Sequence, residues 1–289
     1  MNRTAAELRA EAEAALTGVP ALMLSAERLA AAATPGAHGK RRAGTGEDFW
    51  QYRPAAPGDT ARSIDWRRSA RSDAQFVRDR EAEVAQSAVI WVSGAAGMDF
   101  SGAATRPRKA DRANLLALAL ALALLGSGER VALAGQPPRT GRLQAERMGQ
   151  ALVARTRLDV DEDMPPAEAL RPGQRVILFD DFLGDPAPAL AYLQRAAGLG
   201  VQGAMLQVLD PDEQGFPYSG AVLFRSGSGV LRHDTRDAAG LREAYLARLA
   251  ERREMLSRAA LQAGWHFGTH DTAVPPAQAL MWLWSVLEG

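Results

Sequence analysis

Short apolar runs alternate with longer helical stretches over most of the chain, and this alternation predicts an α/β fold. The apolar runs have the composition of buried strands. They are AVIWV at residues 88–92, RVALA at 130–134, RVILF at 175–179 and GAMLQVL at 203–209. Helices are predicted at residues 111–126, 143–156, 186–198, 238–263 and 276–287, and a hairpin at residues 221–225 and 229–231. Strands that alternate with such helices form a mainly parallel sheet with helices on both faces.

The first part of the chain has a different pattern. Residues 4–33 are rich in Ala, Leu, Glu and Arg, and they predict two helices separated at Pro20. The glycine-rich residues 34–46 predict a loop. In residues 47–80 aromatic residues are interleaved with arginines, which predicts an arm of short strands and turns. We therefore expect two parts: residues 1–83 with the N-terminal helices and the arm, and residues 84–289 with the α/β domain.

Composition removes several classes of function. The chain has 34 basic and 34 acidic residues, so its formal net charge is zero. A neutral chain has no general attraction to nucleic acid, and we expect no nucleic-acid partner. The chain has no cysteine, which excludes disulfide bonds, a thiolate nucleophile and a metal bound by cysteine.

Neither a signal peptide nor a transmembrane segment is predicted. Charged residues such as Arg3, Glu7 and Arg9 interrupt the apolar residues at the N-terminus. The longest apolar run, residues 115–125, has 11 residues and is too short to cross roughly 30 Å of hydrocarbon. We interpret it as a buried core helix; the alternative, an interfacial segment, lacks the required polar face. We expect a cytoplasmic location, in keeping with the absence of cysteine.

A signature of glycine, arginine, aromatic and acidic residues lies at residues 44–71. It resembles, without a gap, the signature of the bacterial family called domain of unknown function 58 (DUF58). Asp48 stands where that family has Glu, and Thr60 replaces the second Asp of a Pro-Gly-Asp-Asp turn. The matching positions are Gly44, Gly46, Phe49, Arg53, Pro57, Gly58, Asp59, Arg62, Ile64, Asp65, Trp66, Ser69, Ala70 and Arg71.

The resemblance covers roughly residues 20–285 and has three implications. It implies a von Willebrand A-like, Rossmann-like fold for the second part of the chain. Relatives are often encoded beside MoxR-type AAA+ ATPases, which makes such an ATPase the expected partner, and other von Willebrand A-like proteins are alternative partners. The biochemical activity of the family is largely unassigned.

Three interpretations of the signature stay open. Arg and aromatic residues such as Trp50, Arg67 and Arg68 are frequent at binding hot spots, which favours a partner-binding surface. Alternatively, the carboxylates of Asp59 and Asp65 pair with Arg53, Arg62 or Arg71 and have a structural role. Aromatic residues among arginines also suit single-stranded nucleic acid, but six acidic residues between positions 47 and 79 dilute the positive charge.

The resemblance also implies a metal site, and this chain lacks its ligands. Von Willebrand A-like domains bind a divalent cation with Asp-x-Ser-x-Ser after the first strand, a set of hard oxygen ligands. Here Ser93, Ala95 and Gly97 take those positions, so one carboxylate and two hydroxyls are lost. We predict a degenerate site with no metal and no other cofactor. A shifted ligand set that uses Asp99 and Ser101 is the alternative.

Acidic and histidine residues near the strand ends are the remaining candidates. Asp180 and Asp181 follow the third apolar run, and in metal-binding relatives an acid there lies near the cation. The alternative is that Asp181 caps the next helix or accepts hydrogen bonds from loop amides. His266 and His270 have a metal-binding spacing only in a helix, and Gly268 between them argues against a helix.

The sequence contains no nucleophile elbow, no Ser-His-Asp order and no Walker-type glycine loop. We therefore predict that the protein is not an enzyme. The predicted function is that of an adaptor which works with a MoxR-type AAA+ ATPase in protein maturation or complex assembly. The alternative is a hydrolase-type enzyme that uses Asp180, Asp181 and His270 at the carboxyl ends of the strands.

Overall fold

The computed structural model describes residues 24–31, 40–54, 64–69, 76–84, 87–154, 163–226, 230 and 232–288, and for residues 40–53, 68, 77–84 and 288 it describes the backbone only. The chain divides into two compact units, residues 37–86 and residues 1–36 together with 87–289. The predicted division placed the N-terminal helices with the arm. The helix at residues 24–31 belongs instead to the α/β unit, because Ala26, Leu29 and Ala30 pack in its core.

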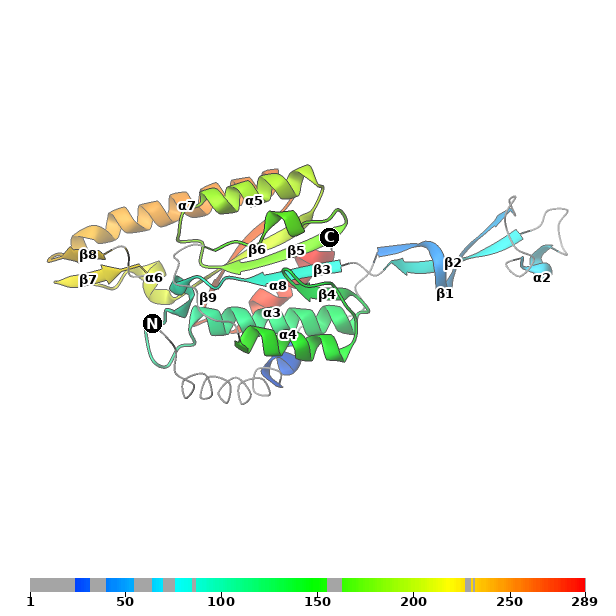
Figure 1. The fold of residues 1–289 in the computed structure, drawn as a ribbon, viewed down its shortest axis with the longest axis horizontal. Helices are drawn as coiled ribbons and strands as arrows, with labels where there is room; N and C mark the ends of the chain where they lie inside the picture. The colour runs from blue at the N-terminus through cyan, green and yellow to red at the C-terminus, as the bar shows by residue number, and fades with distance from the viewer. Residues whose placement is uncertain are drawn as a thin grey trace. The chain divides into compact units, whose positions relative to one another are not determined.

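Five parallel strands form the sheet of the α/β unit. They are β3 (Ser87–Val92), β4 (Arg130–Leu133), β5 (Gln174–Asp180), β6 (Gln202–Leu209) and β9 (His266–Asp271). Their order is β4-β3-β5-β6-β9, and every neighbouring pair is parallel (Figure 1). This is a doubly wound order, in which the chain reverses direction across the sheet between β3 and β5. The predicted α/β, Rossmann-like class of fold is confirmed.

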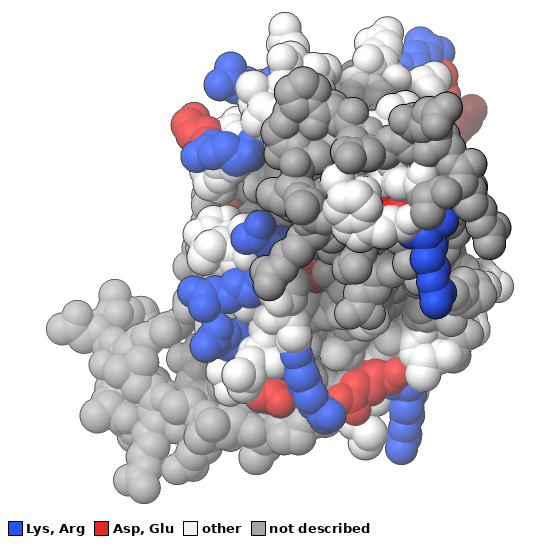
Figure 2. All heavy atoms as spheres, turned by 90° about the vertical axis from the view of Figure 1, so that its right-hand side faces the viewer, with Lys and Arg blue, Asp and Glu red and all other residues white. Residues whose placement is uncertain are grey.

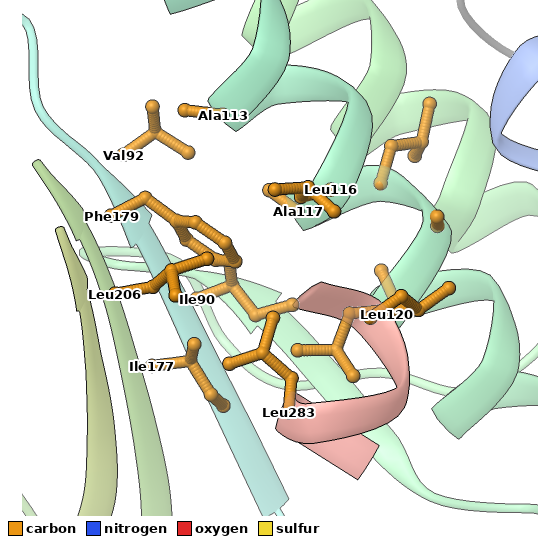
Figure 3. Close-up of a cluster of buried hydrophobic side chains, with 14 of the residues drawn as sticks. Ile90, Val92, Ala113, Leu116, Ala117, Leu120, Ile177, Phe179, Leu206 and Leu283 are labelled. Carbon is orange, nitrogen blue, oxygen red and sulfur yellow. The ribbon is translucent and has the colours of Figure 1, made fainter. Parts of the chain in front are cut away.

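Helices cover both faces of this sheet. The helices α3 (Lys109–Gly126), α4 (Arg142–Ala154) and α8 (Pro276–Glu288) lie on one face, and α5 (Ala187–Gly198) and α7 (Arg242–Gln262) lie on the other (Figure 1). On the first face, side chains from α3 and α8 meet the apolar residues of the central strands (Figure 3). The residues that Figure 3 labels there include Ile90, Leu116, Phe179 and Leu283.

The apolar run of residues 115–125 lies within α3 and is a core helix, as predicted. Leu116, Leu118 and Leu120 are fully buried, because α3 packs against the sheet on one side and against α4 and α8 on the others. Among the described residues, no helix is both long enough and apolar enough to span a bilayer.

The polar segments of the α/β unit were predicted less well. The hairpin consists of β7 (Val222–Arg225) and β8 (Arg232–Thr235), so its second strand begins three residues later than predicted. Strand β9 was missed because HFGTHD has no apolar run. It pairs only with β6, at the edge of the sheet. The short helix α6 (Pro211–Gly215) was also not predicted. The described residues of this unit also contain three 3₁₀ turns: η1 (Ala96–Asp99), η2 (Ala167–Ala169) and η3 (Ala239–Leu241).

The other unit contains an antiparallel pair, β1 (Lys40–Pro54) and β2 (Phe76–Val84), and the short helix α2 (Trp66–Ser69) (Figure 1). Strands were predicted in this region. The loop predicted for residues 34–46 is wrong from Lys40 onward, because Lys40 to Gly44 pair with Val84 to Arg80. Backbone pairing across the two strands outweighs the local preference of glycine for turns.

Candidate functional site

The candidate site lies at the carboxyl edge of the sheet, where β3 and β5 end side by side. Ligands of doubly wound folds bind at this edge, near the point where the strand order reverses. The Ser93 amide donates to the Phe179 carbonyl at 2.8 Å, which fixes the start of the loop after β3 to the end of β5. The Ser93 hydroxyl in turn accepts a hydrogen bond from the Ala95 amide at 3.1 Å. Ser93 is therefore a buried residue that shapes the loop.

Lys109 is the central charge of the site, and sequence analysis did not identify it. Its Nζ lies 2.7 Å from Asp181 Oδ2 and 2.6 Å from Glu213 Oε1, and its side chain has no exposed surface. Burial alone lowers the pKa of Lys109, but Asp181 and Glu213 outweigh burial and hold the pKa above its ordinary value. The ammonium is thus a permanent positive charge between two carboxylates from different elements.

Glu213 reaches Lys109 because the N-terminus of α6 is capped. The Asp210 carboxylate accepts a hydrogen bond from the Asp212 amide at 2.9 Å, and the Asp210 amide donates to Glu213 Oε2 at 3.0 Å. These reciprocal bonds form a capping box, which fixes the Glu213 side chain. Burial raises the pKa of Glu213, and the ammonium of Lys109 partly offsets that rise. The other carboxylate oxygen, Oε1, is the one that binds Lys109.

The two strand-end acids have different environments. Asp181 Oδ1 accepts a hydrogen bond from the Leu183 amide at 2.9 Å, while Oδ2 binds Lys109. Asp181 therefore accepts a hydrogen bond from a loop amide, which is one of the two roles suggested by the sequence. It does not have the other suggested role, that of capping α5. The Asp185 carboxylate accepts from the Ala187 amide at the start of α5. Burial, and then the charge of Asp181, raise the pKa of Asp180 far above its ordinary value, against the effect of the Ser93 hydroxyl.

The residues at the expected metal position do not fit a divalent cation. Ser93 offers one neutral hydroxyl, Ala95 is a buried methyl group, and a Cβ on Gly97 would lie 2.9 Å from Asp181 Oδ2. The Asp181 carboxylate, which would be the remaining ligand, is bound to the ammonium of Lys109. Within the described ranges, no group of three or more His, Cys, Asp or Glu side chains has a geometry that could hold a metal ion.

The shifted ligand set is not assembled either. The Asp99 carboxylate lies 3.5 Å from Arg108 Nη1, and the Ser101 hydroxyl donates to the Ala103 carbonyl at 2.8 Å. These two side chains are thus committed to different neighbours within the same loop.

His270 faces a cation instead of the strand-end acids. Its Nε2 lies 2.9 Å from Arg112 Nη1, and Arg112 Nη2 donates to the Thr272 carbonyl at 2.8 Å. Because a guanidinium only donates, Nε2 must accept and the imidazole is neutral. Burial and the neighbouring Arg112 lower the pKa of His270 to about 4. His266, four residues earlier on β9, is exposed, so the two imidazoles do not share a site.

The signature residues are only partly described. In β1 the backbone of Asp48, Phe49, Trp50 and Arg53 is described, and Gly58, Asp59, Arg62 and Arg71 lie outside the described residues. The Asp65 amide donates to the Phe76 carbonyl at 2.8 Å, and the Ser69 hydroxyl accepts from the Phe76 amide at 2.9 Å. The backbone of Asp65 and the side chain of Ser69 therefore join α2 to β2. The pairing of Asp65 with an arginine stays a prediction.

Two described residues of α2 within the signature are exposed to solvent. Trp66 is 57% exposed and Arg67 is exposed, whereas the side chain of Arg68 is not described. On the face shown in Figure 2, the described basic side chains are interspersed with acidic ones. Among the described residues of this face, the basic side chains do not form the continuous basic surface typical of nucleic-acid binding.

Two cavities open beside β3, and the strand-end acids are not among the residues that line them. They have volumes of about 270 and 340 Å³, and Ala134, Gln136 and Pro165 line both. Their walls are mostly apolar, and neither includes Asp180, Asp181 or His270. The combination of a deep pocket, a perturbed acid and a histidine, which would favour an enzyme, is therefore not found in these cavities.

Comparisons with known proteins agree with the signature. Residues 51–255 match the profile of a family described as "Protein of unknown function DUF58". The uncharacterized protein Mb1516 of Mycobacterium bovis is 29% identical over 231 residues, which cover 74% of this chain and 71% of the relative. The uncharacterized protein Rv1480 of Mycobacterium tuberculosis matches with the same identity and coverage.

Two solved structures also resemble the chain. One is the conserved hypothetical protein BatB from Bacteroides thetaiotaomicron, with 15% identity and a TM-score of 0.43. The other is an aerotolerance-related membrane protein from Bacteroides fragilis, with 15% identity and a TM-score of 0.41. Each match covers 70% of this chain and 98% of the solved chain.

Proposed function

Because this chain belongs to the DUF58 family of proteins of unknown function, we propose that it is a non-catalytic interaction protein with a degenerate metal-ion site. It works with a MoxR-type AAA+ ATPase in the maturation or assembly of other proteins. The observation that carries the proposal is the pairing of Lys109 with both Asp181 and Glu213. This pairing engages the charged groups at the edge where a doubly wound fold binds its ligand.

The internal pairing favours a binding role over catalysis. A general base needs a free lone pair and a pKa near the operating pH. A nucleophile needs such a base beside it. Asp181 is bound to Lys109, and the lone pair of His270 is directed at Arg112. The hydrolase alternative requires a histidine in contact with a strand-end acid. The described contacts of Asp181 and His270 do not join these two residues.

The exposed residues of the arm support a contact with a partner. Trp66 and Arg67 are exposed, and Trp and Arg are the residue types most frequent at binding hot spots. We assign the contact to the arm, with Trp50, Arg67 and Arg68 as its anchors, or to the loops at the carboxyl ends of the strands. The resemblance to the family supplies the ATPase as the partner. Both proteins meet in the cytoplasm, where ATP is available.

Co-purification with the AAA+ ATPase encoded nearest to this protein tests the proposal. Tagged protein at micromolar concentration should retain the ATPase in at least one of two conditions, with ATP or without nucleotide. Arg67→Ala and Trp66→Ala should weaken retention without a change in the melting temperature. Arg232→Ala on β8, which removes another exposed arginine from the other unit, is the matched control. Failure to retain the ATPase in both conditions would contradict the proposed partnership.

A further inference from the structure

A single buried cation joins three segments that lie far apart in the sequence. Lys109 begins α3, Asp181 follows β5 and Glu213 lies in α6. The side chain of Lys109 has no exposed surface, and those of Asp181 and Glu213 are 6% and 14% exposed. Removing one partner from such a pair leaves an uncompensated buried charge, which is strongly destabilising. The ammonium thus compensates two buried carboxylate groups that contact the same atom.

The position of Lys109 is unusual for a lysine. The first turn of a helix carries the partial positive charge of the helix dipole, which favours anions and disfavours cations. Lys109 is nevertheless the first residue of α3, a helix of 18 residues. Its place is therefore explained by the two carboxylates it binds and not by the preferences of the helix.

The two distances to Lys109 Nζ are those of charge-assisted hydrogen bonds, and they are only slightly longer than the distances from calcium to its ligands. Two carboxylate oxygens lie 2.7 and 2.6 Å from the same atom, Lys109 Nζ. Calcium ligands lie at about 2.3–2.6 Å and magnesium ligands at about 2.0–2.1 Å. The oxygens would move inward only slightly to bind calcium, and by about half an ångström to bind magnesium. Both metals prefer such carboxylate oxygens.

We propose that the Lys109 ammonium is a built-in cation which replaces a divalent metal ion between Asp181 and Glu213. The carboxyl edge of the sheet is then held together without metal, and it does not need the ligands that are missing at Ser93, Ala95 and Gly97. The absence of a side chain at Gly97 leaves room for Asp181 to bind Lys109, because a Cβ there would lie 2.9 Å from Asp181 Oδ2. This inference concerns the site itself and holds whichever partner the protein binds.

Metal rescue of a lysine variant tests the inference. The melting temperature of the full chain is measured in 5 mM EDTA and in 5 mM calcium or magnesium chloride, a concentration about fivefold above the roughly 1 mM dissociation constants of the weakest calcium sites. The wild-type protein should melt at the same temperature in all three buffers. Lys109→Ala should melt about 10 °C lower in EDTA. Calcium should raise the melting temperature of Lys109→Ala part of the way back, with a saturable dependence on concentration. Magnesium should raise it by less.

Two further variants separate metal binding from other effects of the salt. Lys109→Met removes the charge but keeps the volume of the side chain, so it should lose stability and gain nothing from calcium. Lys109→Ala combined with Asp181→Asn removes one of the two ligands, and calcium should no longer raise its melting temperature. A saturable calcium shift in the wild-type protein, or a folded Lys109→Ala protein without one, would overturn the inference.

The inference stays testable if Lys109→Ala does not fold. The double variant with Asp181→Asn carries one buried charge less, so it should fold where the single variant fails. Refolding of the single variant should also succeed when calcium is present during refolding. If the double variant does not fold and calcium does not rescue refolding of the single variant, charge compensation is not the role of Lys109 and the inference is overturned.

Discussion

Gly97 and Asp181 approach each other so closely that no side chain fits between them. A Cβ atom on Gly97 would lie 2.9 Å from Asp181 Oδ2, and Lys109 holds that oxygen in place at 2.7 Å. The loop after β3 and the end of β5 therefore meet at a contact that requires glycine at position 97.

Gly97→Ala should destabilise the protein, because the added methyl group displaces Asp181 from Lys109. Overpacking of this kind costs about 1–3 kcal/mol. The free energy of unfolding in urea measures the effect. Gly126→Ala is the control, since nothing lies within 4 Å of a Cβ at that position in α3 and alanine is the better helix former. Equal stability of the Gly97→Ala and wild-type proteins would show that Asp181 moves aside freely.

Asp181→Asn should be more destabilising than the loss of an exposed ion pair. It removes one of the two carboxylates that compensate the buried ammonium of Lys109, and breaking a buried pair costs about 3–5 kcal/mol. Asp111→Asn is the matched control, because Asp111 and its partner Arg108 are both about half exposed. Loss of that pair costs about 0–1 kcal/mol. Similar losses in the two variants, measured by urea unfolding, would indicate that Glu213 alone compensates Lys109.

Asp180→Asn should stabilise the protein at neutral and alkaline pH. Burial, followed by the charge of Asp181, raises the pKa of Asp180 in the folded state well above 3.8. The folded state therefore holds a proton that the unfolded state releases, so this acid costs stability increasingly as the pH rises above about 4. Asparagine resembles the protonated acid and does not titrate. Its stabilising effect should be largest at pH 8 and shrink toward pH 4, and melting curves with the same difference at both pH values would contradict the raised pKa.

The sequence predicted those parts of the fold whose local pattern agrees with their tertiary environment. Strands β3, β5 and β6 are buried on both faces, so they consist of apolar runs that are visible without a structure. Strand β9 lies at the edge of the sheet, and HFGTHD carries no comparable run. Lys40 to Gly44 have the composition of a loop, and only pairing with β2, far away in the sequence, makes them a strand.

Of the candidate site, only the two acids at the end of β5 were predicted from the sequence. Asp180 and Asp181 were identified because they directly follow an apolar run. Lys109 is 72 residues before Asp181 and 104 residues before Glu213, so sequence spacing does not bring these residues together. Two local signals did exist. Asp210-Pro-Asp-Glu213 directly after β6 is a capping box that places Glu213 at the sheet edge, and Lys109 is a cation in the first turn of a helix.

His270 should make the protein sensitive to mild acid. Its pKa is lowered to about 4 in the folded state, first by burial and then by Arg112, from 6.5 in an ordinary environment. The stability that this neutral imidazole supports is present above pH 6.5 and is lost as the pH falls toward 4, because the unfolded state takes up a proton first. The loss amounts to about 3 kcal/mol at most. Arg112 contributes to it, since its guanidinium donates to Nε2 and cannot do so once Nε2 is protonated.

His270→Gln should therefore flatten the dependence of stability on pH between 6.5 and 4. The amide oxygen of glutamine can accept the hydrogen bond from Arg112, and glutamine does not titrate. His266→Gln is the matched control, because it changes an exposed histidine on the same strand and should leave the pH dependence as in the wild-type protein. Free energies of unfolding in urea at pH 7, 6, 5 and 4 measure the effect. A slope retained in His270→Gln would show that groups other than His270 cause the acid sensitivity.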